Sequence, residues 1–190
     1  MSPADLEDLQ RLYAGSVDPW NFRESAYEQA KFAATRDALA RPRYAACLEL
    51  GCGNGELARH VAPLCDRYVG VDAVEIAVAE ARRAVPAATF LTGVLPEDLP
   101  AGSFDLLILS EVLYFFESDA IRDLARRIHR RWPRAEIVCV CYLGPTEQAL
   151  TGTQAFEAFA GALPERRFET IARTKDYCIA RSLAEAGDDA

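Results

Sequence analysis

The chain has 190 residues, 51% of them hydrophobic, which is enough for one domain with a single buried core. Its formal net charge of −8 opposes the electrostatic capture of nucleic acid, which depends on a surplus of Lys and Arg, so we expect no nucleic-acid partner. Its first residues do not resemble a secretion signal, no apolar run is long enough to span a membrane, and the six cysteines form no CxxC pair. These features predict a cytoplasmic protein with no membrane partner and no metal site.

Two helices are predicted ahead of the first strand, at residues 5–13 and 25–39. From residue 45 onward, short apolar runs alternate with helical patterns, which is typical of βαβ units and a parallel sheet. The predicted strands are residues 45–50, 67–71, 89–94, 104–110 and 136–142, and the predicted helices between them are residues 56–64, 74–84 and 118–131.

The last part of the chain follows a different pattern. A helix is predicted at residues 148–163, followed by strands at 168–174 and 177–183 that form an antiparallel hairpin. Residues 186–190 are polar and are expected to be frayed. The whole chain therefore predicts one α/β domain, with a mostly parallel sheet, a terminal antiparallel hairpin and N-terminal capping helices.

A glycine-rich turn follows the first predicted strand, in the segment Leu48-Glu49-Leu50-Gly51-Cys52-Gly53-Asn54-Gly55. Glycines at such a turn leave no side chain between the backbone and a ligand, and the next helix directs free N–H groups at it. Because residue 56 is Glu, the dinucleotide pattern GxGxxG is not satisfied.

Two carboxylates flank this turn. Glu49 precedes it and suits the ammonium of an amino-acid moiety, while Asp72 ends the second strand, where its carboxylate suits ribose hydroxyls. The turn and these acids together predict a site for a nucleoside with an amino-acid tail. The alternative is an ordinary tight turn with Asp72 as a helix N-cap.

These residues resemble the class I S-adenosylmethionine-dependent methyltransferases, over about residues 45–142. The resemblance implies a Rossmann-like seven-stranded sheet and S-adenosylmethionine as cofactor, converted to S-adenosylhomocysteine. It assigns the cofactor's methionine and ribose to Glu49, the turn glycines and Asp72. No acidic residue follows the third strand, so Val94 and Leu95 are expected to hold adenine by packing and backbone groups. The assigned cofactor site comprises Trp20, Glu49, Gly51, Cys52, Gly53, Gly55, Asp72, Ala73, Val94, Leu95 and Ser110.

The flanking segments Asp18-Pro19-Trp20, Tyr27-Glu28 with Lys31, and Asp176-Tyr177-Cys178 are similar to the rhizobial nodulation protein S methyltransferases. This narrower resemblance implies N-methylation of a free amino group on a glucosamine unit of a chitooligosaccharide. It gives the expected partner as a small-molecule or oligosaccharide substrate.

Two candidate catalytic residues follow the fourth strand, at the sheet edge where ligands bind in open α/β folds. An amine must be uncharged to accept a methyl group, so Glu111 is the candidate base or ammonium anchor, with Tyr114 beside it. A structural carboxylate is the alternative for Glu111, and core packing is the alternative for Tyr114. Trp20, Tyr27 and Lys31 are candidates for a lid that excludes water.

The favoured interpretation is transfer of a methyl group to an amine, with residues 1–44 as a helical cap, 45–144 as the cofactor core and 145–190 as the acceptor side. Transfer to a hydroxyl stays open. A nicotinamide-dependent oxidoreductase is disfavoured by the broken dinucleotide pattern, and a non-catalytic binding module by the intact set of cofactor residues. The oligomeric state and the identity of the acceptor are not predicted.

Overall fold

The computed structural model describes residues 3–183, and its elements follow the predicted order. Two helices, α1 (Pro3–Gly15) and α2 (Ala26–Asp37), precede the sheet. The elements that follow are β1 (Tyr44–Leu50), α3 (Glu56–Val61), the 3-10 turn η1 (Ala62–Leu64), β2 (Cys65–Asp72), α4 (Glu75–Ala84), β3 (Thr89–Thr92), β4 (Leu106–Ser110), the 3-10 turn η2 (Leu113–Phe115), α5 (Ser118–Arg131), β5 (Glu136–Tyr142), α6 (Gly152–Gly161), β6 (Glu169–Arg173) and β7 (Tyr177–Ser182).

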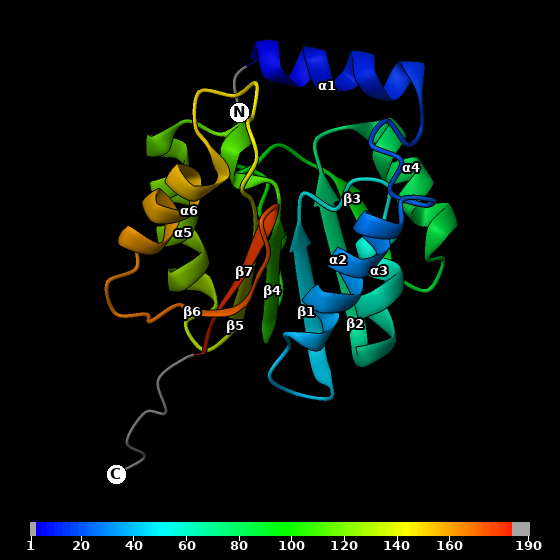
Figure 1. Ribbon diagram of the computed structural model, residues 1–190. Helices are drawn as coiled ribbons and strands as arrows, with labels where there is room; N and C mark the ends of the chain where they lie inside the picture. The colour runs from blue at the N-terminus through cyan, green and yellow to red at the C-terminus, as the bar shows by residue number, and fades with distance from the viewer. Residues whose placement is uncertain (1–2, 184–190) are drawn as a thin grey trace.

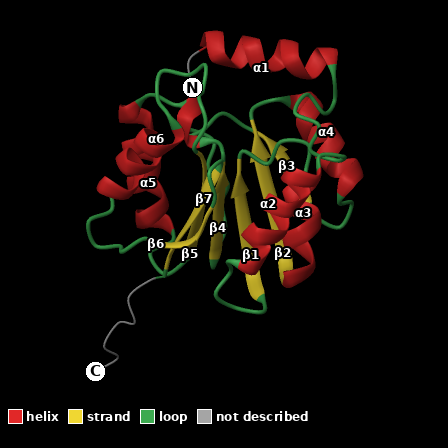
Figure 2. Cartoon of the chain, in the orientation of Figure 1, coloured by secondary structure: helices red, strands yellow, loops and turns green. Residues whose placement is uncertain are grey.

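The described strands form one seven-stranded sheet in the order β3-β2-β1-β4-β5-β7-β6. The first five strands are parallel, whereas β7 runs antiparallel to both β5 and β6. Figures 1 and 2 show α5 and α6 on one face of the sheet and α2, α3 and α4 on the other. The predicted Rossmann-like sheet and its terminal antiparallel hairpin are therefore confirmed.

The strand order reverses direction between β1 and β4, because the chain builds β2 and β3 outward on one side and returns to add β4 on the other. In open α/β sheets such a switch point leaves a crevice at the carboxyl ends of the two strands, where ligands bind. Helix α1 crosses above these strand ends (Figure 1). The topology thus determines where a site is built.

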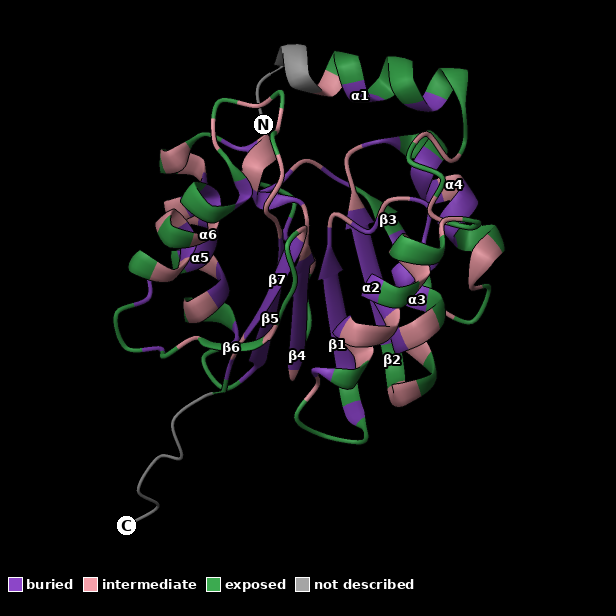
Figure 3. Ribbon diagram, in the orientation of Figure 1, coloured by how far each residue is buried: buried purple, intermediate pink, exposed green. Residues whose placement is uncertain are grey.

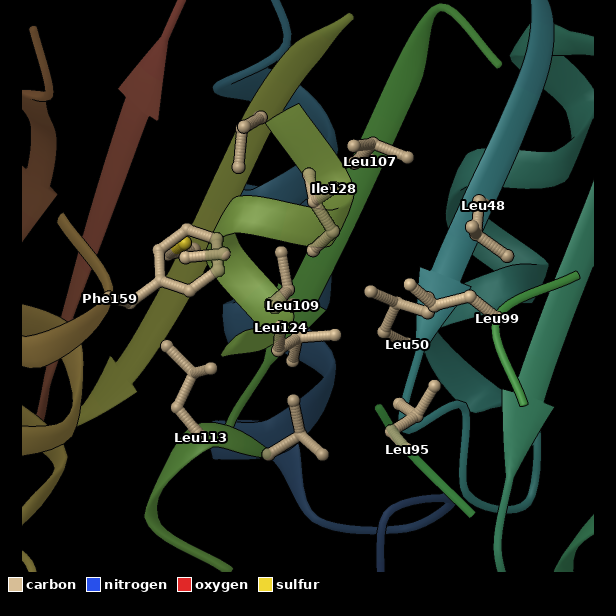
Figure 4. Packing of buried hydrophobic residues seen from close by; sticks show 14 of the residues in the cluster. Leu48, Leu50, Leu95, Leu99, Leu107, Leu109, Leu113, Leu124, Ile128 and Phe159 are labelled. Carbon is tan, nitrogen blue, oxygen red and sulfur yellow. The ribbon is translucent and has the colours of Figure 1, made fainter. Parts of the chain in front are cut away.

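Side chains of the central strands alternate between two buried layers. On β4, Leu107 and Leu109 pack with α5 and α6, while Leu106 and Ile108 pack on the opposite face, and all four are fully buried. Figure 4 shows Leu109 beside Leu124 of α5 and Leu107 nearer to Ile128 of the same helix, and Figure 3 shows the burial of the central strands. This two-faced burial explains the uninterrupted apolar run of the fourth strand.

Several element boundaries differ from the predicted ones. The predicted helix at 148–163 begins only at Gly152, because Thr151 caps it with a capping box that involves Gln154. The predicted strand at 89–94 ends at Thr92, and the predicted helix at 56–64 becomes 3-10 after Val61. The last of these changes coincides with a Pro early in the 3-10 turn.

The expected fraying of residues 186–190 lies outside the described residues. Between residues 3 and 183, no helix combines the length and the apolar character that crossing a bilayer requires.

A first prediction concerns Gly55, which directly precedes α3, has φ +81° and would place a Cβ 2.8 Å from the Cα of Ala81. We expect Gly55→Ala to lower the free energy of unfolding by about 2–4 kcal/mol, since it adds left-handed strain to an overpacked helix contact. Denaturant unfolding measures this change.

The matched control is Gly161→Ala in the last turn of α6, where a Cβ would meet nothing within 4 Å. It should be neutral or stabilising by up to about 1 kcal/mol. Equal destabilisation by both substitutions would contradict the packing role of Gly55.

Candidate functional site

A cavity of about 430 Å³ lies at the carboxyl ends of β1, β2, β4 and β5, and α1 and α2 contribute to its walls. Small-molecule sites have volumes of this order. It brings together most of the residues that the sequence singles out, namely Trp20, Glu49, Gly51, Cys52, Gly53, Asp72, Ala73, Leu95, Ser110, Glu111 and Tyr114.

The glycine turn forms the floor of the cavity between β1 and α3. Gly51 and Gly53 have φ values of +79° and +50°, in the left-handed region that favours glycine. A Cβ on Gly51 would lie 2.4 Å from Cγ2 of Val112, and one on Gly53 would lie 3.2 Å from the hydroxyl oxygen of Tyr13. The backbone of this turn is therefore open to a ligand on one side and tightly packed on the other.

Two predicted cofactor residues do not line the cavity, Gly55 and Val94. Gly55 packs against Ala81, so it serves helix packing instead of ligand approach. The Val94 backbone N–H donates to Oδ2 of Asp98 at 2.9 Å, while Gly93 and Leu95 on either side do line the cavity. The third strand ends at Thr92, two residues before Val94.

Asp72 joins the glycine turn to the start of α4. Its Oδ2 accepts the Gly53 N–H at 2.9 Å, and its Oδ1 accepts the Val74 N–H at 3.0 Å. Burial raises the pKa of Asp72, while these backbone N–H groups lower it. Each oxygen retains a lone pair, so the carboxylate holds the turn and can still accept hydrogen bonds from a ligand.

Glu49 is buried, with 1% of its surface exposed, and its Oε2 accepts the Tyr68 hydroxyl at 2.6 Å. Burial raises the pKa of Glu49 to about 8; the bond from Tyr68 lowers it and the charge of Asp72 raises it. An ammonium group near this carboxyl would favour the ionised form.

Glu111 lies directly after β4 and has φ +52°, which is uncommon for a residue with a side chain. Its Oε2 is 2.6 Å from Nζ of Lys31, and that ammonium is also 2.8 Å from Oε2 of Glu28. The other oxygen, Oε1, is buried and has no hydrogen-bond partner among the described residues. An unusual backbone angle and an unsatisfied buried oxygen are features that collect at functional sites.

Aromatic side chains form the wall above the turn. The rings of Trp20 and Phe22 stack with centroids 5.5 Å apart, and Tyr13 meets Trp20 edge-on at 5.5 Å. After β4, the Tyr114 ring packs against Phe115 with centroids 4.9 Å apart. These rings shield the cavity from solvent while leaving a concave surface.

The segment between α1 and α2 is tied to the turn. Oδ1 of Asp18 accepts the Phe22 N–H at 2.8 Å and the Asn54 side-chain amide at 3.0 Å. Arg23 donates to Glu56 at 3.1 Å and to Glu80 at 3.0 Å. The aromatic wall is thereby anchored to the elements that carry the glycines.

The sequence-based interpretation did not assign Tyr13, Glu28 or Tyr142 to the site, although all three line the cavity. Glu28 carried a usable signal, because it lies three residues before Lys31 on a helix and the two side chains meet there. Tyr13 and Tyr142 come from distant parts of the chain and carried no comparable signal.

The fold, with its cavity at the switch point, is that of the class I methyltransferases. The crystal structure of N-methyltransferase NodS from Bradyrhizobium japonicum WM9, in complex with S-adenosyl-L-homocysteine, matches it with a TM-score of 0.82 at 19% identity. The match covers 95% of this chain and 98% of that chain. At this identity the likeness shows the fold.

The sequence comparison is more specific. The model of the family described as Nodulation protein S (NodS) matches residues 2–130, more than half of the chain. The chain belongs to the nodulation protein S family, as its flanking segments predicted.

Two curated members show how far the similarity extends. Nodulation protein S of Bradyrhizobium diazoefficiens is 32% identical over 116 residues, and that of Azorhizobium caulinodans is 29% identical over 133 residues. These segments cover 56% and 67% of this chain, and 56% and 64% of the respective relatives. The matched part thus spans less than two thirds of each relative.

A second prediction follows from Glu49. Since the folded chain keeps this proton up to a pH of about 8 and the unfolded chain loses it near 4.5, the unfolding free energy contributed by Glu49 falls as pH rises between these values. Glu49→Gln mimics the protonated form and does not titrate. Its free energy of unfolding minus that of wild type should therefore increase by about 2–4 kcal/mol as the pH is raised from 5 to 8.

Denaturant unfolding across this pH range measures the difference. Glu97→Gln, at an exposed position, is the control and should follow the wild-type curve. A difference between Glu49→Gln and wild type that stays constant with pH would contradict the raised pKa.

Proposed function

We propose that this chain is an S-adenosylmethionine-dependent methyltransferase that acts on an amine of a small molecule or saccharide. One observation carries the proposal: a single cavity has the glycine turn and Asp72 on one side and Glu111, with an unpartnered oxygen, on the other. Membership of the nodulation protein S family supports it.

The residues present fit this cofactor. Gly51 and Gly53 expose backbone beside the cavity, Asp72 has lone pairs for ribose hydroxyls, and Glu49 suits the ammonium of the methionine moiety. Trp20, Cys52, Ala73, Leu95 and Ser110 complete the walls. When bound, the cofactor supplies a methyl group on a positively charged sulfur.

The division of labour along the chain is part of the proposal. Residues 1–44 act as a cap that excludes water, residues 45–144 hold the cofactor, and residues 145–190 complete the acceptor side. All six cysteines are free thiols, which fits a cytoplasmic enzyme.

The acidic balance beside the cavity favours an amine over a hydroxyl. Glu28 and Glu111 share the single ammonium of Lys31, so the three side chains carry a net charge of −1 when the carboxyls are ionised. A cationic acceptor neutralises this charge, whereas a neutral hydroxyl does not. Glu111 then takes the proton that the amine must lose, and Tyr114 lines the same region. The glucosamine unit of a chitooligosaccharide meets these requirements.

A third prediction tests the cofactor. We expect Asp72→Asn to weaken S-adenosylhomocysteine binding by about 10–100-fold, because a carboxylate makes stronger hydrogen bonds to hydroxyl donors than an amide does. Isothermal titration calorimetry measures the affinity. Asp66→Asn is the matched control, since Asp66 is exposed near the opposite end of the same strand and should bind as wild type does.

If wild-type protein bound no S-adenosylhomocysteine, the proposed function would be wrong. An equal loss of S-adenosylhomocysteine affinity in Asp72→Asn and Asp66→Asn would show that Asp72 has no specific role in binding.

A fourth prediction tests the acceptor. Methyl transfer from S-adenosylmethionine is expected with D-glucosamine or its oligomers and not with D-glucose, which offers hydroxyls alone. Glu111→Gln should lower kcat by about 10²–10⁴-fold, the usual contribution of a positioned base. Release of S-adenosylhomocysteine, measured by chromatography, reports the rate. Methylation of D-glucose at a comparable rate would point to a hydroxyl acceptor.

A further inference from the structure

Lys31 is a charged residue in an unusual place. It lies on α2 with 1% of its surface exposed. Its ammonium contacts Glu111, a residue 80 positions later in the sequence. Burying an ammonium is costly unless charged partners compensate it. Here two carboxylates do so, at 2.6 Å for Glu111 and 2.8 Å for Glu28.

The ammonium engages one oxygen of Glu111 and leaves the other free. Oε2 is held by Lys31, and the Glu111 backbone N–H is held by the Val140 carbonyl at 2.9 Å. Oε1 is buried without a hydrogen-bond partner in the described part of the chain, and Glu111 lines the cavity. Glu111 is therefore fixed at its backbone and at one carboxylate oxygen, and Oε1 is the acceptor that remains.

We propose that Lys31 is a positioning residue, which holds Oε2 of Glu111 so that Oε1 takes the proton of the acceptor ammonium. This inference rests on the proposed function. In the step, an N–H bond of the acceptor breaks, an O–H bond forms on Oε1, and the electron pair stays on nitrogen. The carboxylate becomes neutral, and the proton later leaves to solvent.

The surroundings of Glu111 support a dependence on Lys31. The titratable groups near its carboxyl are Tyr27, Glu28 and Lys31 of α2, Tyr114 after β4, and Cys141 of β5, and Tyr142 lines the same cavity. Burial raises the pKa of Glu111, Lys31 lowers it, and Glu28 raises it. Lys31 is the cation in this set, so its removal leaves only influences that favour the protonated carboxyl, which cannot accept a proton.

A purely structural role for Lys31 is the competing explanation. An apolar side chain of similar volume anchors a helix at least as well as a buried ion pair does, because it avoids the cost of removing charges from water. Phe32, the next residue, is already buried against neighbouring apolar side chains. A structural role would change stability or kcat equally at every pH, whereas a positioning role changes the titration of Glu111.

The test follows the Glu111 carboxyl directly, in the full chain without added ligand. Glutamate side chains are labelled with carbon-13, the Glu111 resonance is assigned by its loss in Glu111→Gln, and its titration is recorded by NMR. In Lys31→Met the titration midpoint should rise by about 1–3 pH units. Lys31→Arg keeps the charge and should restore the midpoint. Lys175→Met changes the chain's other lysine, which is exposed, and should match wild type.

Glu28→Gln should shift the titration midpoint of Glu111 in the opposite direction. It removes a carboxylate that competes for Lys31, so the Glu111 midpoint should fall. This variant keeps the inference testable if Lys31→Met does not fold. A Glu111 midpoint that moves in neither Lys31→Met nor Glu28→Gln would overturn the inference.

Kinetics with D-glucosamine and S-adenosylmethionine add the functional readout. Lys31→Met should lower kcat by about 10–100-fold at neutral pH and recover as pH rises past the displaced midpoint. A loss of the same size at every pH would assign Lys31 a structural role. If wild-type protein methylates no D-glucosamine, that result counts against the proposed acceptor, and the NMR titration alone decides the role of Lys31.

Discussion

The structure depends on a turn between a buried strand and a helix in which three glycines lie close to neighbouring elements. The left-handed residues Gly51, Gly53 and Gly55 of this turn face Val112, Tyr13 and Ala81 respectively, so a single loop contacts the segment after β4, the helix α1 and the helix α4. Asp72 then accepts an N–H of the same turn. The positions of the cavity floor, its roof and one of its walls follow from this close packing, because each element can approach only where the Cβ atoms are missing.

Buried carboxylates show how the chain separates structural support from chemistry. Near the amino end of β5, both oxygens of Glu136 are engaged, by the Ala40 N–H at 2.9 Å and the Tyr44 hydroxyl at 2.6 Å. At the carboxyl edge, Glu111 has one oxygen engaged and one without a partner. A fully satisfied acid stabilises the strand that carries it, whereas a half-satisfied acid keeps an acceptor available at the cost of some stability.

Sequence patterns predicted the sheet, its hairpin and the acids around the turn, since these depend on local periodicity and glycine spacing. The packing of Gly55 against Ala81 was not predictable, because three glycines at equal spacing look alike until the helix that packs on one of them is known. Val94 does not line the cavity, although Gly93 and Leu95 on either side do, and a strand pattern alone could not separate these three neighbours. The ion pair of Lys31 with Glu111 joins residues far apart in sequence, and only the fold brings them together.

The walls of the cavity come from two parts of the chain, the segment before the sheet and the sheet with its glycine turn. Glu28, Lys31 and the aromatic ring of Trp20 belong to the segment before the sheet, whereas the glycine turn and Asp72 belong to the sheet itself. Under the proposed function, substitutions at Glu28 and Lys31 can change the surroundings of Glu111 without altering the strand register or the glycine turn. Under the proposed function, natural selection can therefore diversify the accepted substrate within one short stretch of the gene while the methyl donor stays the same.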